Sequence, residues 1–421
     1  MTDQIVRPSV RLQADPAPET RPPQGRGRRL LHSDWARTFA VVLLFHGALT
    51  VLAVLFQGTL PEFHRDPNEL SGLRPQLLLH TFRWDSVHYN GILNGRYTDP
   101  ATPWTAAFYP VFPLAVGLVQ TITFGKLGVL ASGLIVNFTA TWLAATALLR
   151  IARHFVRAPW APWLAVSAFL TAPTAYFLHS FYSEATFCAI AFWAYLFALR
   201  RKWAWMGLCL IVATTTRLPS ALFVLLCLLE FCRAHDWQPR RLLSWNLLWF
   251  PAAYIGFGCY ALYLKLAVGD GLAMFHAYQY DEWPYQVTNP NIPQTIAREL
   301  RTSATAVINA PVGNWALISH VIPIVGLGIL LLAAWWMLRA HRGAGVPLAI
   351  FGIAAMVMFT LNSNVVSVHR FLLPCIVIYL AMATAAERGP RLRAAMGGLM
   401  ATHTLLMAFL YCLFIMGIWS G

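Results

Sequence analysis

The sequence contains few carboxylates, so those able to do chemistry can be examined one by one. Only 17 of the 421 residues are acidic, and Asp85 stands out because it lies in the run FRWDSVHY at residues 82–89. If this stretch is helical, Trp84, Asp85 and His88 share one face. A carboxylate beside an imidazole suits the binding and deprotonation of a hydroxyl group. The alternative is a solvated Asp in an aromatic segment at a membrane surface.

Two further charged groups lie at the edges of apolar runs. Glu184 follows Tyr182 in the run HSFYSE, at the start of an apolar helix, where the helix dipole favours a carboxylate. It is either a site residue or a helix cap. Arg217, in the run TTTRLP, would be costly at membrane depth and would face a cavity or a partner there. It could hold a phosphate through two hydrogen bonds, or it could pair with Glu184 inside the bundle.

A second cation follows near the C-terminus. His369 and Arg370 lie between the polar run NSN and the run FLLP. Arg370 suits a phosphate, or else it extends its charged end to the membrane surface. The segment 276–289, HAYQYDEWPYQVTN, is dense in aromatic and polar groups. Such a mixture is typical of a surface that binds sugars or lipid headgroups, or of an interfacial loop with an aromatic girdle.

The composition indicates that membrane helices must position these residues. Hydrophobic residues make up 58% of the chain and charged residues 11%, whereas soluble domains have roughly 45–50% and 25%. This excludes an ordinary soluble protein and predicts an all-α, polytopic membrane protein. Apolar runs of spanning length occur at 38–57, 127–149, 160–178, 183–199, 245–267, 315–338, 345–361, 367–385 and 398–418.

Two apolar stretches are ambiguous, and the distribution of charge decides between arrangements. In the favoured one, 106–124 is interfacial or re-entrant and 203–232 is a pair of short crossings, giving about eleven crossings in all. This places 21 of the 31 basic residues on the cytoplasmic side, as the positive-inside rule requires. The other arrangement also has eleven crossings, but it puts the basic clusters at 150–157 and 200–202 outside.

The favoured arrangement gathers the unusual polar residues on the outer face. The hydrophilic loops 58–105 and 269–313, which we expect to bear short helices, lie there together with the polar junctions between crossings. Residues 1–34 are rich in Pro, Arg and polar residues and are predicted to form a disordered cytoplasmic tail. Residues 35–421 are predicted to form a single transmembrane domain with a cavity that opens outward.

The sequence gives no positive sign of a bound cofactor, metal or nucleic acid. The seven cysteines lie in apolar stretches and form no CxxC pair, which disfavours a zinc site or a disulfide framework. No metal is predicted, and a metal requirement stays open. The net charge of +14 comes largely from short clusters between apolar runs, which is a membrane pattern and not a nucleic-acid one.

Several sequence blocks resemble those of the PIG-V-like mannosyltransferases. The block WDSVHY at 84–89, which includes Tyr89, is followed by the double-proline block AFYPVFPL at 107–114, and this pair carries most of the resemblance. The block YSEATF at 182–187 and the block TRLPS at 216–220 also look like blocks of this family, as does HRF at 369–371.

The resemblance implies a fold, a reaction and a location. The fold would be GT-C-like, with the active site on the non-cytoplasmic face. The enzyme would be an inverting glycosyltransferase that moves mannose from a polyprenyl-phosphate donor to a lipid or glycan hydroxyl. Asp85 would be the catalytic base, with Trp84 and His88 shaping its pocket.

The other candidate residues would bind substrate in this interpretation, namely Tyr89, Tyr182, Glu184, Arg217, His369 and Arg370. The expected partners are the lipid-phosphate sugar donor, the acceptor and membrane lipids. The use of Arg over Lys favours a bacterial inner membrane, with the site facing the periplasm. The alternative is a lipid-linked sugar transporter or flippase, which would share the cavity and its cations. A transporter often has paired repeats with broken helices in both halves, whereas the sequence has a plausible break only at 217–219.

Overall fold

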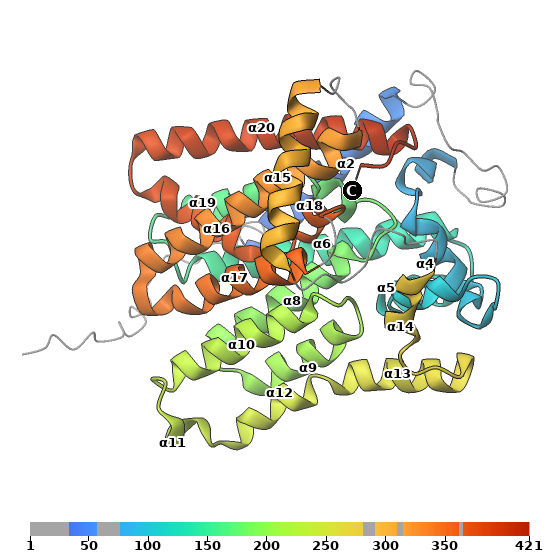
Figure 1. Ribbon diagram of the computed structural model, residues 1–421, viewed down its shortest axis with the longest axis horizontal. Coiled ribbons are helices and arrows are strands. Elements are labelled where there is room, and N and C mark those ends of the chain that lie inside the picture. The colour runs from blue at the N-terminus through green and yellow to red at the C-terminus, as the bar shows by residue number, and fades with distance from the viewer. Residues whose placement is uncertain (1–32, 57–75, 281–290, 310–314, 362–364, 421) are drawn as a thin grey trace, which may run out of the picture.

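The computed structural model describes residues 33–56, 76–280, 291–309, 315–361 and 365–420. Throughout these ranges the chain is helical or lies in turns, without a strand (Figure 1), which confirms the all-α class. The helices of ten or more residues are α2 (Asp34–Phe56), α5 (Val111–Ile122), α6 (Val129–Ala152), α7 (Ala161–Leu170), α8 (Glu184–Leu199), α9 (Trp203–Thr214), α10 (Ser220–Ala234), α13 (Ile255–Val268), α15 (Ile292–Asn309), α16 (Ile322–His341), α17 (Val346–Thr360), α19 (Ile376–Glu387) and α20 (Pro390–Ile415).

Shorter helices join these elements or lie at their ends. They are η1 (Gln76–Thr81), α4 (Asp85–Leu93), η2 (Arg96–Thr98), η3 (Pro103–Ala107), η4 (Ala175–Leu178), α11 (Pro239–Leu242), η5 (Trp245–Leu248), α12 (Trp249–Ala252), α14 (Ala273–His276), η6 (Ala277–Gln279), the π-helical turn η7 (Leu317–Val321), η8 (Arg342–Ala344) and α18 (Val368–Phe371).

Membrane-spanning helices are present, as the composition predicts. Within the described ranges, five helical stretches are long and apolar enough to cross a bilayer, and they are α2, α6, Trp245–Val268, Leu317–Ala344 and α20. Shorter apolar helices lie between them. The chain is therefore a multi-pass integral membrane protein, while the number of eleven crossings stays a prediction.

The two ambiguous stretches are resolved into short helices. The stretch 203–232 is divided into α9 and α10, because Pro219 lacks a backbone N–H and begins a new helix in place of continuing the old one. The structure thus has the two helices that the sequence predicts here. The double-proline stretch forms only α5, whose 12 residues would span about 18 Å of a hydrocarbon layer about 30 Å thick.

Helices α6, α8 and α19 form the centre of the bundle. Helix α8 is buried along almost its whole length and lies against α6, α9 and α10. Helix α19 is equally buried and lies against α7, α16 and α20. Small residues make this close packing possible, since Ala lets helix backbones approach each other in lipid. In Figure 1, the axes of α6, α16 and α20 are roughly aligned, and α15 lies across α16 and α17.

One end of the bundle gathers the turns that carry the basic clusters, and we call it the basic end. Here Asp34 at the start of α2 pairs with Arg153 at 2.7 Å. At the α19–α20 turn, Glu387 accepts hydrogen bonds from two backbone N–H groups of the α6–α7 turn. The ring of His341, at the end of α16, lies 5.4 Å from that of Phe155. These contacts place α2, α6, α16 and α19 with their charged ends together.

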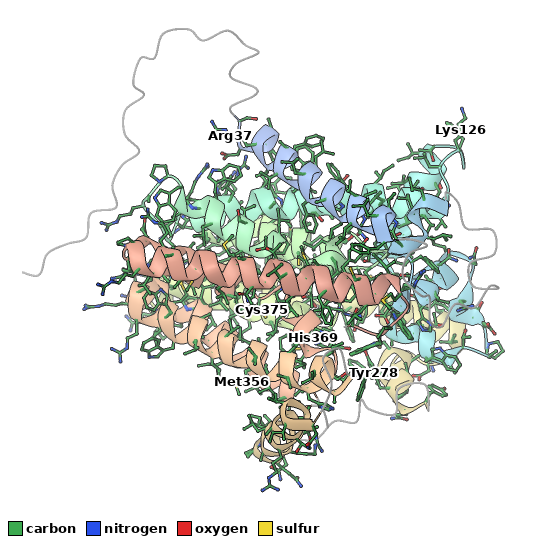
Figure 2. The ribbon with its side chains drawn as sticks, turned by 90° about the horizontal axis from the view of Figure 1, so that it is seen from above. Arg37, Lys126, Tyr278, Met356, His369 and Cys375 are labelled. Atoms are coloured by element: carbon green, nitrogen blue, oxygen red, sulfur yellow. The ribbon has the colours of Figure 1, made fainter. Side chains whose placement is uncertain are left out.

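The polar junctions that hold the candidate site residues lie away from this end. Each of these junctions is one helix length from the basic clusters, as an up-and-down bundle requires. They are the turn after α9, the turn before α8 and the segment before α19. In Figure 2, His369 and Tyr278 lie on the Lys126 side of Cys375. We call this opposite end the site end.

Candidate active site

Asp85 is the first residue of α4, and the backbone turns sharply just before it. Trp84 has a φ of +53°, which is unusual for a residue with a side chain and costs about 1–3 kcal/mol. The turn allows Asp85 to start the helix, where the dipole favours its negative charge. Asp85 and Trp84 therefore do not share a helical face as the sequence predicted, because the helix begins one residue too late.

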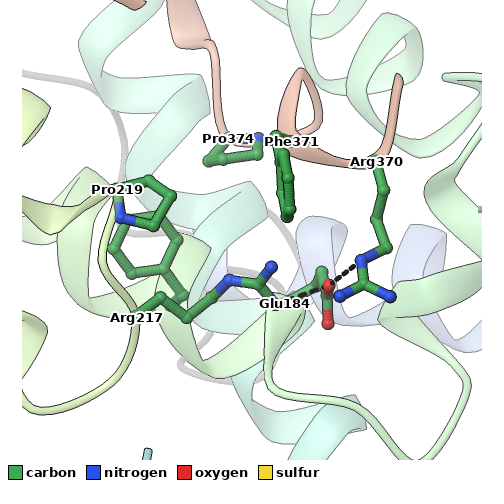
Figure 3. A pocket seen from close by; sticks show the side chains of 7 residues that line it. Glu184, Arg217, Pro219, Arg370, Phe371 and Pro374 are labelled. Atoms are coloured by element: carbon green, nitrogen blue, oxygen red, sulfur yellow. Dashed lines mark hydrogen bonds and ion pairs between the residues drawn. The ribbon is translucent and has the colours of Figure 1, made fainter. Parts of the chain in front are cut away.

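Four charged side chains from four segments form one connected cluster, shown in part in Figure 3. Arg370 Nη1 lies 2.8 Å from Asp85 Oδ2, and Arg370 Nε lies 2.9 Å from Glu184 Oε1. Arg217 Nη1 donates to the same Glu184 oxygen at 2.5 Å. Negative and positive side chains alternate from one contact to the next, in the order Asp85, Arg370, Glu184, Arg217. We call these four residues the charge cluster.

The charge cluster is held largely out of water. The side chain of Glu184 is 2% exposed, and those of Arg370, Arg217 and Asp85 are 10%, 11% and 16% exposed. Removing such charges from water costs several kcal/mol per ion unless each finds partners. The Arg370 guanidinium is also 5.3 Å from the ring centres of both Phe177 and Tyr182, which adds cation–π attraction.

These contacts decide between the alternatives left open for the two arginines. Arg370 is buried between two carboxylates, so it does not extend its charge to the membrane surface. Arg217 does form the ion pair with Glu184 that the sequence offered as one of its two roles. Within the described residues, the hydrogen bonds of Arg217 to Ser183 and Glu184 both come from Nη1, and its side chain also lines the pocket described next.

A small pocket opens beside the charge cluster. It is a narrow gap between packed side chains. Its lining combines both guanidinium groups and one carboxylate with an apolar wall, and it consists of Glu184, Phe187, Arg217, Pro219, Arg370, Phe371 and Pro374. Asp85 is outside this lining and touches it through Arg370. Cations beside an apolar wall suit a phosphate that is attached to a hydrocarbon chain.

Tyrosine hydrogen bonds hold the segment of Asp85 against that of Glu184. The Tyr182 hydroxyl donates to the carbonyl of Arg83 at 3.0 Å. The hydroxyl groups of Tyr89 and Ser183 lie 2.7 Å apart, and Ser183 also accepts from Arg217 at 3.1 Å. Both tyrosines predicted to bind substrate therefore lie at the site, where they position the charged residues.

His88 lies on α4 beside Asp85. Its ring stacks on Phe108 of the double-proline block, with the ring centres 4.5 Å apart. Burial lowers the pKa of His88 below its ordinary value, and the nearby charge of Asp85 opposes this shift. His88 is therefore neutral at pH 7 and can form a hydrogen bond without adding charge to the site.

The remaining predicted residues are placed differently. His369 donates from Nε2 to the carbonyl of Ser420 at 3.0 Å, and thus binds the C-terminal segment. In the aromatic segment, His276 contacts Asp270 at 2.6 Å, and this hydrogen bond lowers the pKa of the carboxyl group of Asp270. Residues 281–289 of that segment lie outside the described residues.

A comparison with protein families identifies the family of this chain. The family model described as Mannosyltransferase (PIG-V) matches residues 51–291, which is more than half of the chain. The chain belongs to the PIG-V mannosyltransferase family. No match was found among curated proteins. Family membership confirms the resemblance seen in the sequence, is consistent with a GT-C fold, and favours a transferase over a transporter.

The matched region contains most of the charge cluster, but not all of it. Asp85, Glu184 and Arg217 lie inside the match, whereas Arg370 lies beyond its end. Arg370 was predicted as a candidate residue, but nothing in the sequence indicated that it joins Asp85 to Glu184. Ser183 was not flagged at all, since a serine before a helix is commonly only a cap.

Proposed function

We propose that this membrane mannosyltransferase moves mannose from a polyprenyl-phosphate donor to a hydroxyl group of a lipid or glycan acceptor. The proposal rests above all on the charge cluster of this family member. In it, the partly exposed carboxylate of Asp85 lies with two buried guanidinium groups. This set contains a base for the acceptor and positive charge for a leaving phosphate. Those are the two groups that the transfer needs.

Asp85 acts as the general base in this reaction. One of its oxygens is held by Arg370, so the other can accept the proton of the acceptor hydroxyl. The acceptor oxygen then forms a bond to the anomeric carbon of mannose, while the bond from that carbon to the phosphate oxygen breaks. The proton remains on Asp85, and polyprenyl phosphate leaves with the electron pair. A direct displacement of this kind inverts the anomeric configuration.

Arg217 and Arg370 bind the donor phosphate. Their positive charge stabilises the negative charge that grows on the phosphate as the bond breaks. The apolar wall formed by Phe187, Pro219 and Pro374 faces the first units of the polyprenyl chain. Because the guanidinium groups supply the positive charge, we expect transfer to continue after treatment with EDTA.

The charge distribution supports an active site on the non-cytoplasmic face. The basic end carries the clusters that the positive-inside rule assigns to the cytoplasm, and the charge cluster lies at the site end. We further propose that the membrane is a bacterial inner membrane, because the chain uses Arg over Lys, and that the site faces the periplasm. Labelling of intact cells with a membrane-impermeant maleimide tests it: the exposed Asn94→Cys should react from outside, and the exposed Arg201→Cys should react only after lysis.

The reaction itself is tested with purified protein in lipid. The protein is incubated with radiolabelled polyprenyl-phosphate mannose and a membrane lipid extract, beside the Asp85→Asn variant. We expect label in a new lipid or glycan product with the wild type and none with the variant. If the label instead only crosses the bilayer still attached to its donor, in both proteins alike, the protein is a transporter and the proposal is wrong.

A further inference from the structure

Three buried histidines form a hydrogen-bonded chain near the site, and the proposed reaction uses none of them. His46 lies on α2, His80 on η1, and His179 directly after η4. The Nδ1 atoms of His46 and His179 are 2.9 Å apart, and the Nε2 atoms of His179 and His80 are 3.2 Å apart. Each of the three is at most 5% exposed. We call these residues the histidine chain.

One backbone carbonyl determines where every proton of the histidine chain lies. His80 Nδ1 is 2.8 Å from the carbonyl oxygen of Leu77, which can only accept, so the proton is on Nδ1. In a neutral ring His80 Nε2 then accepts, and His179 must donate from Nε2. His179 Nδ1 in turn accepts from His46 Nδ1. The chain therefore runs in one direction, with three neutral rings.

The last atom of the chain has no hydrogen-bond partner. His46 Nε2 is a buried acceptor without a donor in the described part of the protein. A buried acceptor without a donor destabilises the fold by roughly 1–3 kcal/mol. The histidine chain is therefore a poor means of stabilising the bundle. Ionisable residues within membrane helices are rare, and they mark function more often than stability.

Two members of the histidine chain lie close in sequence to the two carboxylates of the charge cluster. Asp85 follows His80 by five residues, and Glu184 follows His179 by five residues. Between these points the two segments are also joined by a backbone hydrogen bond, from the N–H of Phe181 to the carbonyl of Thr81, at 2.8 Å. His80 and His179 thus lie in contact at the start of the two segments that carry Asp85 and Glu184 to Arg370.

We propose that His46, His80 and His179 are positioning residues that hold Asp85 and Glu184 at the separation that Arg370 bridges. His46 binds His179 and so connects the segments 80–85 and 179–184 to α2. His179 connects these two segments to each other. A chain of hydrogen bonds suits this task because it forms at only one donor–acceptor distance and with only one arrangement of protons, unlike an apolar contact. The role in catalysis rests on the proposed function, whereas the order of protons does not.

The order of protons is tested by ¹⁵N NMR of histidine-labelled protein in lipid nanodiscs, with signals assigned from single His→Phe variants. At pH 7 we expect three neutral rings, with the proton on Nδ1 of His46, Nε2 of His179 and Nδ1 of His80. A His80 ring protonated on Nε2, or a charged ring anywhere in the chain, would overturn the proposal.

The positioning role is tested by two variants of His46 that differ in a single property. His46→Asn keeps an N–H donor close to the position of Nδ1, whereas His46→Leu removes it. We expect the turnover rate of His46→Asn to stay within about twofold of wild type and that of His46→Leu to fall about fivefold. Equal impairment of the two variants would contradict the proposal.

His179→Phe removes both bonds of the central ring and should have the larger effect. We expect its turnover rate to fall by about 10- to 100-fold, because small misplacements of catalytic groups are costly, while the KM for the donor changes less than threefold. His403→Phe on α20, outside the chain, is the matched control and should resemble wild type. A His179→Phe protein with normal turnover, or one impaired only in KM, would refute the role.

These measurements separate failure of this inference from failure of the proposed function. If no transferase activity is found in any protein, the NMR result still decides whether the chain exists as described. If transfer is found and abolished by Asp85→Asn but unaffected by His179→Phe, the proposed function holds and the histidine chain has no part in it.

Discussion

The Asp34 pairs at the basic end and the charge cluster at the site end differ in burial. At the basic end, Arg153 is 49% exposed and binds Asp34 at the surface. At the site end, Glu184 is 2% exposed and is shared by Arg217 and Arg370. The distances are similar at the two ends, so burial is the difference that matters.

Burial changes what an ion pair can do. A pair in water gains about 0–1 kcal/mol and serves mainly to hold a turn. A buried pair barely repays the loss of hydration, but its charges act on a ligand through a medium of low dielectric constant. The exposed Asp34 pairs thus serve mainly to hold turns together, whereas the buried charges at the site end are the ones that act on the substrate in the proposed reaction. Substitutions at the two ends should separate activity from folding.

The largest effect is expected for Asp85→Asn, which removes the base and keeps the shape. We expect transfer to fall by at least about 1,000-fold, measured with radiolabelled donor, since an amide cannot take up the proton of the acceptor. Thermal unfolding in detergent should stay close to wild type, because Asn can still accept a hydrogen bond from Arg370. An Asp85→Asn protein with near-normal turnover would eliminate Asp85 as the base.

Glu184→Gln should come next, since it leaves two buried cations without their shared countercharge. Breaking such a pair destabilises by about 3–5 kcal/mol, so we expect both a lower midpoint of thermal unfolding and a loss of transfer of about 100-fold. Glu230→Gln is a matched control, because Glu230 is equally buried but pairs with Arg233 on α10. The control should lose stability and keep its turnover at temperatures where it is folded. Loss of stability alone in Glu184→Gln would make Glu184 a structural residue.

Arg217→Ala should have a smaller and more selective effect. Arg217 lines the pocket and shares Glu184 with Arg370, so the variant keeps one cation for the phosphate. We expect the KM for the donor to rise by about 10- to 30-fold with a lesser fall in the turnover rate, as for the loss of a bond made in both ground and transition states. Arg217→Lys should recover part of the affinity. An unchanged KM would remove Arg217 from the donor site.

The contrast between the two ends also explains which features of the fold and the site could be predicted from the sequence. Apolar runs and basic clusters are local signals, so they predicted the all-α class, the split at Pro219 and the grouping of the charged turns. Asp85, Glu184, Arg217 and Arg370 were each predicted as candidate site residues, and for Arg217 the reason was the cost of a charge at membrane depth. The pair of Arg217 with Glu184 was one of the predicted alternatives. The link from Asp85 through Arg370 to Glu184 could not be predicted, because contacts between residues distant in sequence depend on how whole helices pack.

Some local errors have equally physical causes. Trp84 was placed on one face with Asp85 by assuming a continuous helix, but the positive φ of Trp84 starts the helix one residue later. His369 was grouped with Arg370 because the two are adjacent and lie in the HRF block, and the structure shows its Nε2 bound to the carbonyl of Ser420 in the C-terminal segment. Its role in substrate binding stays a prediction.

The smallest effect is expected at the basic end, for Asp34→Asn. The substitution weakens the pairs of Asp34 with Arg150 and Arg153, which at such exposure are worth about 0.2–1 kcal/mol. Turnover should therefore stay within about twofold of wild type. Because the arginines remain, the charge that orients the chain is kept, and the topology reported by Asn94→Cys labelling should not change. A large loss of transfer in Asp34→Asn would show that the two ends are coupled, and that the separation of folding from chemistry between them is wrong.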